Sequence, residues 1–401
     1  MQETSLLFIK NAMIKTMVGK DFSSGCILTE NGKIKAIGEN LSFPAGASVI
    51  DAEGRLTTPG LIDGHSHIGM FGEGCGWEGE DGNEMTDPIT PHMRAIDSLN
   101  PMDEAFRLAI TGGVTTVGTG PGSGNPMGGT FVCVKLNGIR ADSIILRDNF
   151  AMKIAFGENP KRCYGQAQKK SPSTRMATAA LLREILFKAR RYYEELTEFE
   201  NSGIDDKKKP AFDMKLHALL PVIKKEIALK AHAHRADDIF TALRIAREFD
   251  VDITLDHCTE GHLIVEELIK EDKYIFVGPT FGGKPKIELL HKSFETTKVL
   301  SDAGLKVSII TDAPVIPQES LALCAGFAVK AGMNEEKAWK AITITPAQAM
   351  GVDDRVGSLE AGKDADIVIF NGNPLLDIGS SVAYTIIDGK IVYKDTDKRR
   401  I

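Results

Sequence analysis

The sequence of 401 residues predicts an α/β barrel together with a smaller β-domain that both chain ends build. Three observations lead to this prediction. The middle of the chain alternates short apolar runs with helical stretches, which is typical of parallel strands joined by crossover helices. Eight such runs occur in the sequence, and eight strands close an α/β barrel. Both chain ends consist instead of short strands separated by turns.

The two chain ends share strand-like runs, at 5–9, 25–30 and 33–37 and again at 365–370, 382–387 and 390–394. Asn31-Gly32 and Asp388-Gly389 are two-residue hairpin signals between neighbouring runs. The simplest account is one β-domain formed by residues 1–57 and 351–401, with a barrel domain at 58–350.

The predicted barrel strands are 61–67, 113–118, 131–136, 151–156, 227–232, 251–257, 274–277 and 306–312. Helices are expected at 174–199, 213–225, 236–249, 260–271, 286–303 and 335–341. The charged stretch from 157 to 213 exceeds an ordinary connection, so we expect a helical excursion near the barrel mouth.

The composition and charge of the chain disfavour several classes of protein. A net charge of −7 disfavours a nucleic-acid-binding surface, which needs clustered lysine and arginine. No segment approaches the roughly 20 continuous apolar residues of a membrane helix, and the first residues lack the features of a signal peptide. The six cysteines are scattered without a Cys-x-x-Cys pair, which favours reduced thiols in a cytoplasmic protein.

The first predicted barrel strand ends in His65-Ser66-His67. Side chains alternate along a strand, so the two imidazoles point to the same side and could bind one metal ion. Gly64 would allow the backbone to pack closely beside them. An ordinary pair of histidines on a solvated strand is the alternative, so the hypothesis depends on the rest of the chain.

Residues of metal-binding type also end three later strands. His232 and His234 end the fifth, His257 the sixth and Asp312 the eighth. Catalytic groups of a barrel collect at the carboxyl ends of its strands, so these side chains are expected to converge. Imidazoles with one carboxylate suit zinc or a similar ion.

In this order, the motifs resemble those of the amidohydrolase superfamily. The match begins with Pro-Gly-Leu-Ile-Asp-Gly-His-Ser-His at 59–67 and ends with the tail motifs that start at Thr345 and Gly357. Within the superfamily, the chain is similar to imidazolonepropionase and to metal-dependent dipeptidases of the prolidase type. The resemblance implies a distorted (β/α)8 TIM barrel, a β-sandwich from both termini, a small-molecule substrate and a homo-oligomer.

The resemblance also implies roles for single residues. His65 and His67 would hold the more buried metal, and Asp312 would touch that metal and move protons. His232 and His257 would hold a second, more exposed metal.

Strand alternation does not separate His232 from His234, because both lie on one face. The resemblance favours His232 as the ligand, which leaves His234 as a substrate-binding candidate. If His257 faces the barrel axis, alternation turns Asp256 toward the helices.

Lys153 in the fourth strand decides between one metal and two. In binuclear relatives a lysine here becomes carboxylated and gives one oxygen to each metal, and burial among apolar groups favours the neutral amine that this reaction needs. A salt-bridged or substrate-binding lysine is the alternative, and Lys230 and Glu158 are weaker rivals as the bridge. The cofactor is thus expected to be zinc, with two ions if Lys153 is carboxylated and otherwise one.

Three further residues are candidates for substrate binding. Glu158 and Arg162 follow the fourth strand, although this segment could equally be a turn stiffened by Pro160. Arg235 could bind a carboxylate, or it could merely begin a helix with its acidic neighbours.

These residues together predict a metal-dependent hydrolase that cleaves a C–N bond of an amide, dipeptide or cyclic amide by metal-activated hydroxide. Asp312 would serve as general base and then as general acid. A mononuclear imidazolonepropionase-like hydrolase or deaminase is the alternative, using His65, His67, His232 and Asp312. A non-catalytic scaffold is a further alternative, which the complete ligand set disfavours.

Overall fold

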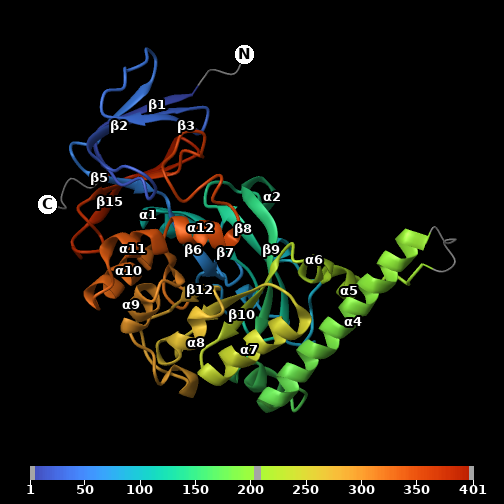
Figure 1. Ribbon diagram of the computed structural model, residues 1–401. Coiled ribbons are helices and arrows are strands. Elements are labelled where there is room, and N and C mark those ends of the chain that lie inside the picture. The colour runs from blue at the N-terminus through green and yellow to red at the C-terminus, as the bar shows by residue number, and fades with distance from the viewer. Residues whose placement is uncertain (1–4, 203–208, 397–401) are drawn as a thin grey trace.

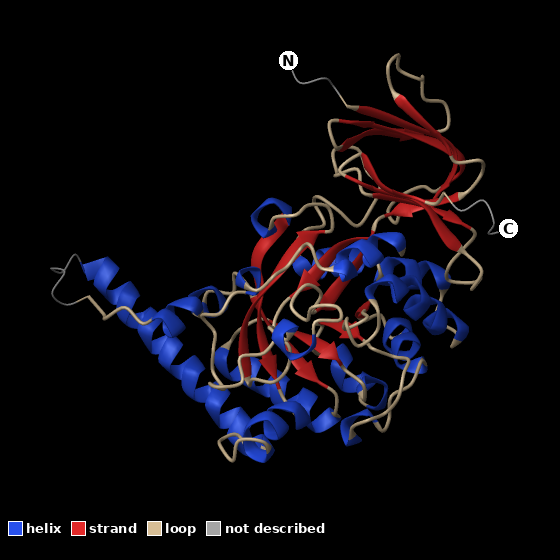
Figure 2. Ribbon diagram, turned by 180° about the vertical axis from the view of Figure 1, so that it is seen from behind, coloured by secondary structure: helices blue, strands red, loops and turns tan. Residues whose placement is uncertain are grey.

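The computed structural model describes residues 5–202 and 209–396 and contains two sheets of eight strands each (Figures 1 and 2). One sheet is formed by the two ends of the chain, and the other is formed by its middle. Figure 1 shows the terminal sheet at one end of the molecule and helices around the other sheet. The predicted fold class is therefore confirmed.

The terminal sheet has the order β16-β15-β14-β5-β1-β2-β3, and β4 also pairs with β1. Its strands are β1 (Leu6–Ile14), β2 (Phe22–Glu30), β3 (Lys33–Gly38), β4 (Ser48–Asp51), β5 (Leu56–Pro59), β14 (Ile367–Asn371), β15 (Ser381–Ile387) and β16 (Lys390–Lys394). Both predicted hairpins are present, because Glu30 pairs with Lys33 and Ile387 pairs with Lys390.

The barrel sheet follows chain order from β6 to β13. Its strands are β6 (Leu61–Ser66), β7 (Val114–Thr119), β8 (Met127–Lys135), β9 (Ile145–Ala155), β10 (Ala228–Ala233), β11 (Ile253–His257), β12 (Tyr274–Val277) and β13 (Lys306–Ile309). All eight lie where a strand was predicted, with ends that differ by a few residues.

The prediction of parallel strands throughout is wrong at β8, which runs antiparallel to both β7 and β9. A parallel connection needs a crossover of a dozen or more residues. The short connections on either side of β8 hold only one helical turn, α2, so the chain reverses direction there instead.

The helices are α1 (Glu104–Thr111), α2 (Ala141–Ile144), α3 (Glu158–Pro160), α4 (Arg175–Ser202), α5 (Met214–Ala218), α6 (Leu220–Ile223), α7 (Ala236–Phe249), α8 (Val265–Ile269), α9 (Glu295–Asp302), α10 (Leu321–Lys330), α11 (Glu335–Ala341) and α12 (Ile344–Met350). A π-helical turn covers Lys161–Gln166, and short 3-10 turns lie at Gly76–Gly79, Ala95–Asp97, Gly261–Leu263, Ile287–Leu289 and Gln318–Ser320. Helix α7 agrees with its predicted span, whereas the helix predicted over 286–303 is only a 3-10 turn followed by α9.

Helix α7 shows how the barrel and its helices share one core. Ile239, Ala242, Leu243 and Ala246 are buried and recur at helical spacing, so they form one apolar stripe. They belong to the same hydrophobic cluster as Leu229 of β10. The long helix α4 packs against α7 and then runs outward, away from the barrel (Figure 1).

The edge strands β6 and β13 are joined by side chains and loops. The His67 amide donates to the Ala313 carbonyl at 2.7 Å, and the Thr311 amide donates to the Asp63 carboxylate at 3.0 Å. These contacts bring the carboxyl ends of β6 and β13 together and thereby complete a distorted barrel.

The chain passes between the two sheets at Gly60, between β5 and β6. We propose domain boundaries near the predicted positions: at Gly60 rather than after 57, because β5 extends to Pro59, and after 350, the last residue of α12. Across residues 5–202 and 209–396, no helix has the length and apolar character needed to cross a membrane.

Candidate metal centre

Two groups of metal-binding side chains lie at the carboxyl ends of the barrel strands. Their possible ligand atoms lie within 4.8 Å of one another inside each group: His65, His67 and Asp312 in the first group, and His232, His234 and His257 in the second. The two groups adjoin, because the rings of His65 and His257 have centroids 5.2 Å apart.

The first group is held by β6 and by the residues that follow β13. One carboxylate oxygen of Asp312, Oδ1, lies 3.3 Å from His65 Nε2 and 3.2 Å from His67 Nε2. Asp312 has a left-handed backbone with φ of 56°, which an aspartate tolerates better than most side chains. This turn after β13 directs the carboxylate toward the two imidazoles.

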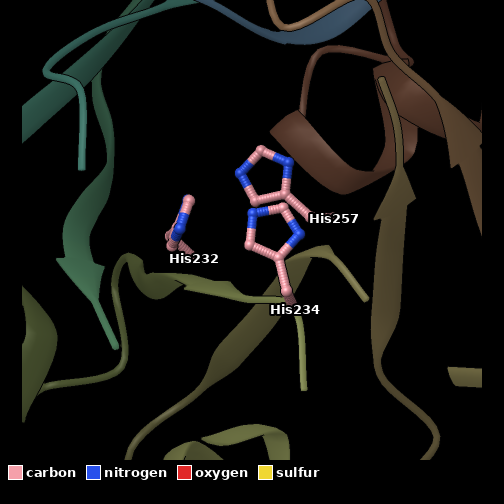
Figure 3. A group of neighbouring side chains, drawn as sticks. All are labelled: His232, His234 and His257. Carbon is pink, nitrogen blue, oxygen red and sulfur yellow. The ribbon is translucent and has the colours of Figure 1, made fainter. Parts of the chain in front are cut away.

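The second group is held by β10 and β11, and Figure 3 shows its three imidazoles facing a common space. The rings of His234 and His257 stack with centroids 4.6 Å apart, and the ring of His232 stands nearly perpendicular to His234. The structure thus brings both His232 and His234, at the end of β10, into this group. The choice between them as the metal ligand stays open.

Hydrogen bonds orient three of these rings. His67 Nδ1 donates to the Gly120 carbonyl, and His257 Nδ1 donates to the Gly278 carbonyl, both at 2.7 Å. His234 Nδ1 shares a hydrogen bond of 2.7 Å with the hydroxyl of Thr259. A ring whose Nδ1 carries the proton presents the lone pair of Nε2, which is the arrangement common in metal-ligating histidines.

Three buried atoms of the groups have no hydrogen-bond partner among the described residues. They are His65 Nδ1, His232 Nε2 and Asp312 Oδ1. Buried polar atoms are nearly always paired, so each unpaired atom requires an explanation. Together with the lone pairs of the other imidazoles, these atoms fit a divalent cation, because nitrogen and carboxylate donors suit zinc and its neighbours.

The charge states of the side chains fit the same interpretation. Burial, followed by the neighbouring histidines, holds the pKa values of His232 and His234 well below their usual range. Burial raises the pKa of Asp312, but His257, His65 and His67 outweigh it and leave that pKa well below normal. Neutral imidazoles beside an ionised carboxylate are the forms that bind metals.

Lys153, in β9, lies beside the first group. Its Nζ is 3.5 Å from His65 Nε2 and 3.2 Å from the Asp256 carboxylate. Burial lowers its pKa, although Asp256 and Asp312 act in the opposite direction. Lys230 Nζ bonds to the other oxygen of Asp256 at 2.8 Å, so one carboxylate pairs with two buried lysines.

The expectation that Asp256 faces the helices is wrong. In the sheet register Asp256 lies opposite His232, so normal alternation turns its side chain into the barrel. His257 reaches the interior as well because its φ of 69° breaks the alternation at the end of β11.

Asp63 links the strands that carry the first group. Its Oδ2 accepts hydrogen bonds from the Thr311 amide at 3.0 Å, the Thr311 hydroxyl at 2.6 Å and Gln318 Nε2 at 2.7 Å. Its Oδ1 accepts from the His65 amide at 3.1 Å. Asp63 therefore fixes the position of His65 relative to the residue before Asp312.

The predicted substrate-binding residues other than His234 lie outside the described lining of the cavity at the two groups. Arg235 forms two bonds of 2.9 Å with Asp237. Arg162 is exposed on the π-helical turn, and the Glu158 amide donates to the Glu288 carboxylate at 2.9 Å. Their roles in substrate binding stay predictions.

A cavity of about 740 Å³ opens onto both groups, and its lining includes His67, His232, His234 and Asp312. This volume lies within the range of small-molecule sites. Further lining residues come from the loops after β6, β7 and β12 and from Asn159.

Sequence reasoning missed three buried acids around the groups. Asp63 was visible in the opening motif, and Asp256 was visible beside His257, but strand alternation alone suggested the wrong orientation for Asp256. Glu288, whose Oε1 lies 3.8 Å from His234 Nε2, gave no signal, because it sits in a segment predicted to be a helix.

The model of the amidohydrolase family matches residues 56–392. Amidohydrolase tasK of Hapsidospora irregularis is 29% identical over 94% of this chain, which spans only 41% of that relative. An imidazolonepropionase of Thermoplasma volcanium is 24% identical over 97% of this chain and 98% of the relative. The crystal structure of an amidohydrolase from Thermotoga maritima MSB8 superposes with a TM-score of 0.93, at 40% identity, covering 97% of this chain and 100% of that one.

Proposed function

Because the chain belongs to the amidohydrolase family, we propose that it hydrolyses a carbon–nitrogen bond in a small amide, dipeptide or cyclic amide. The observation that carries this proposal is the convergence of two groups of buried metal-binding side chains on one cavity. The relatives bear names of hydrolases that act on such bonds.

His65, His67 and Asp312 would hold one divalent ion, and His232 and His257 would hold a second, with His234 as the alternative to His232. Zinc is the proposed metal. When bound, such an ion polarises a carbonyl and lowers the pKa of water to about 7. The proton transfers of the reaction are assigned to side chains of the protein.

Asp312 is the proposed proton carrier. Its low pKa keeps the carboxylate ionised at neutral pH, so it can accept a proton from the attacking water. The same carboxyl group can then donate that proton to the leaving nitrogen. Asp312 lines the cavity, where both the water and the substrate would lie.

We propose carboxylation of Lys153 for the form with two ions. Burial favours the neutral amine, which is the form that reacts with carbon dioxide, and nearby cations would hold the product. The contact between Lys153 and Asp256 at 3.2 Å favours a second candidate, in which Lys153 remains an ammonium and one ion is bound. This candidate is a mononuclear hydrolase like imidazolonepropionase, or a deaminase.

A metal-replete activity screen tests the proposed function. The panel should contain N-acyl amino acids, Xaa-Pro dipeptides, cyclic amides and amino-substituted heterocycles. Elemental analysis of the same sample separates the candidates, since about two ions per chain support a carboxylated lysine and about one supports the mononuclear form. Absence of divalent metal, or no turnover across the panel, would contradict the proposal.

Asp312→Asn tests the proton carrier. We expect turnover to fall by about 10²- to 10⁴-fold, because an amide cannot accept the proton, while the circular dichroism spectrum stays unchanged. Asp302→Asn is the matched control, since Asp302 is a half-exposed residue of α9 paired with Lys298. Near-normal turnover of a metal-loaded Asp312→Asn enzyme would remove Asp312 from this role.

We further propose a cytoplasmic homo-oligomer without a nucleic-acid partner. The six cysteines are all free thiols, which suits a reducing compartment, and the net charge of −7 disfavours phosphate binding. Sedimentation analysis of the purified protein would measure its oligomeric state.

A further inference from the structure

One wall of the cavity is built by the segment that follows β12, residues 279–292. Three lysines of this segment line the cavity: Lys284, Lys286 and Lys292, which we call the lysine wall. The only acidic residue among the described lining residues is Asp312, which belongs to the candidate metal centre. The lining is therefore cationic even before a metal ion adds its charge.

The lysine wall is not neutralised by hydrogen-bonded carboxylates. Lys284 Nζ donates to the Leu290 carbonyl at 2.7 Å. Lys292 Nζ donates to the carbonyls of Gly282 and Gly283 at 3.0 and 2.9 Å. Neither lysine forms an ion pair with any carboxylate in residues 5–202 or 209–396.

Lys286 has a carboxylate neighbour, but not at hydrogen-bond distance. Its Nζ lies 3.7 Å from Glu288 Oε1, which is itself buried without a hydrogen-bond partner among the described residues. The side chain of Lys286 is 21% exposed, so its ammonium remains accessible from the cavity.

The charges of the wall act on one another and on the metal centre. Burial, followed by the charge of Lys284, lowers the pKa of Lys292. After burial and the neighbouring histidines, Lys286 contributes to the low pKa values of His232 and His234. Like charges that repel inside a cavity destabilise the empty protein, and an anionic ligand relieves this repulsion.

Other residues of the lining are polar but neutral. Asn159 Nδ2 donates to the Ser123 hydroxyl at 2.7 Å, while its Oδ1 is buried without a hydrogen-bond partner among the described residues. An unpaired carbonyl oxygen in a cavity suits an N–H donor of a ligand. The cavity thus offers both cations and an amide acceptor to a ligand.

We infer that the lysine wall binds the carboxylate of the substrate, so that the bond to be cleaved belongs to an N-acyl amino acid or a dipeptide with a free carboxyl end. In the proposed complex, the amide or peptide group of the substrate lies over the histidines, and the substrate carboxylate lies against Lys286 and its neighbours. The inference deepens the proposed function and rests on it for the identity of the bond, but not for the presence of an anion site.

Calorimetric titration of the purified full-length protein tests the anion site without turnover. The probes are N-methanesulfonyl-L-alanine and its carboxamide, which differ only in the carboxylate and whose sulfonamide bond resists hydrolysis. We expect the acid to bind about 10- to 100-fold more tightly than the carboxamide, as a charged hydrogen bond allows. Added salt should weaken only the binding of the acid.

Variants of the wall locate the site. Lys286→Gln and Lys292→Gln should each remove most of the preference for the acid and leave the affinity for the carboxamide unchanged. Lys270→Gln is the matched control, because Lys270 is an exposed lysine that pairs with Glu267 and is not among the lining residues of the cavity. Unaltered metal content and circular dichroism of the variants show that the fold is retained.

The outcomes separate this inference from the proposed function. Equal affinity for acid and carboxamide, no measurable binding of the acid, or an acid preference that survives both wall substitutions would overturn the anion site. An acid preference that depends on the wall supports it even if no amide is hydrolysed, and failed hydrolysis would then count against the proposed function alone.

Discussion

The carboxylate of Asp256 lies among three ionisable groups inside the barrel. His65 Nδ1 is 3.1 Å away, Lys153 Nζ 3.2 Å and Lys230 Nζ 2.8 Å. Burial raises the pKa of this carboxyl group, but His65, Lys230 and Lys153 outweigh it and hold the pKa well below normal. Asp256 thus supplies the negative charge that two buried lysines share.

Asp256→Asn should destabilise the protein strongly. Removal of one partner from a buried ion pair leaves an uncompensated charge, which costs about 3 to 5 kcal/mol. Urea unfolding measures the loss, and Asp252→Asn, at an exposed position just before β11, is the matched control. A free energy of unfolding equal to that of the control would show that the two lysines do not depend on Asp256.

The identity of the metal-binding candidates could be predicted from sequence, but their orientation could not. Alternation and strand-end position selected His65, His67 and Asp312, and the structure brings them together. The direction of Asp256 was predicted wrongly because His257 also reaches the interior: its left-handed backbone, with φ of 69°, breaks the alternation that would have turned Asp256 toward the helices. The left-handed backbone of a single residue cannot be predicted from the pattern of apolar and polar residues in the sequence.

Among the elements, β6 packs unusually closely against its neighbours at Gly64. A Cβ atom there would lie 2.3 Å from Phe276 Cε1 in β12 and 3.2 Å from Pro346 Cβ in α12. The hydrogen atom of glycine therefore lets β6 approach both elements, and the adjacent His65 is positioned by the same contact.

Gly64→Ala tests this packing. We expect a loss of about 1 to 3 kcal/mol in the free energy of unfolding, because the added methyl group must displace a ring inside the barrel. Metal affinity should fall as well, since His65 would move with the backbone. Gly38→Ala is the control: its Cβ would meet Leu41 at an ordinary 3.4 Å. Unchanged stability and metal affinity would mean that the ring of Phe276 moves aside without a measurable cost in free energy.

Two helices show how a clear period helps a prediction and how its absence hinders one. Helix α7 has an amphipathic stripe and was found at its predicted residues. Helix α10 was missed because Leu321–Lys330 is almost entirely apolar and therefore shows no alternation between a buried and an exposed face. The reversal at β8 depends on the length of its connections, a feature that apolar runs alone do not reveal.

At the scale of the whole molecule, Lys135 joins the barrel to the terminal sheet. It ends β8 and pairs with Asp364 at 2.7 Å, Asp366 at 3.1 Å and also Asp388, all outside the barrel. Burial raises the pKa of Asp366 to about 6, although Lys135 acts against this shift. One ammonium thus holds three carboxylates at the contact between the two sheets.

Lys135→Met should destabilise the molecule by about 3 to 5 kcal/mol near neutral pH, since the buried carboxylate of Asp366 loses its cation, whereas Asp364 keeps Lys33 and Arg355. The loss should be smaller below pH 6, where Asp366 can take up a proton. Lys35→Met is the control, because Lys35 forms an exposed pair with Glu30 that contributes little. A pH-independent loss would show that apolar packing, rather than charge, joins the two sheets.

The buried histidines determine how the metal-free molecule responds to acid. The folded-state pKa of His65 is about 3, and burial also lowers the pKa values of His232, His234 and His257. In the unfolded chain histidine titrates near 6.5. Below that pH the unfolded state binds protons that the folded state does not bind, so stability decreases as the pH falls.

Each such histidine contributes up to about 1.4 kcal/mol per pH unit, so together they should produce a steep decline below about pH 6.5. The buried carboxylates Asp256 and Asp312 have lowered pKa values, so their contribution is lost only below about pH 4. Between these limits Asp366 acts in the opposite direction, because its folded-state pKa is raised to about 6, so the contribution of the histidines is measured by comparing histidine variants. Urea unfolding of chelator-treated protein across this interval measures the decline.

Zinc should oppose the decline, because the ion binds neutral imidazoles and stabilises only the folded state. His217→Gln, at an exposed residue of α5 outside both groups, should leave the pH dependence of the metal-free protein unchanged. His232→Gln should make the decline shallower, since one fewer imidazole then changes its protonation on unfolding. A stability that stays level from about pH 6.5 to about pH 4 would mean that the folded state protonates these rings as readily as the unfolded chain does.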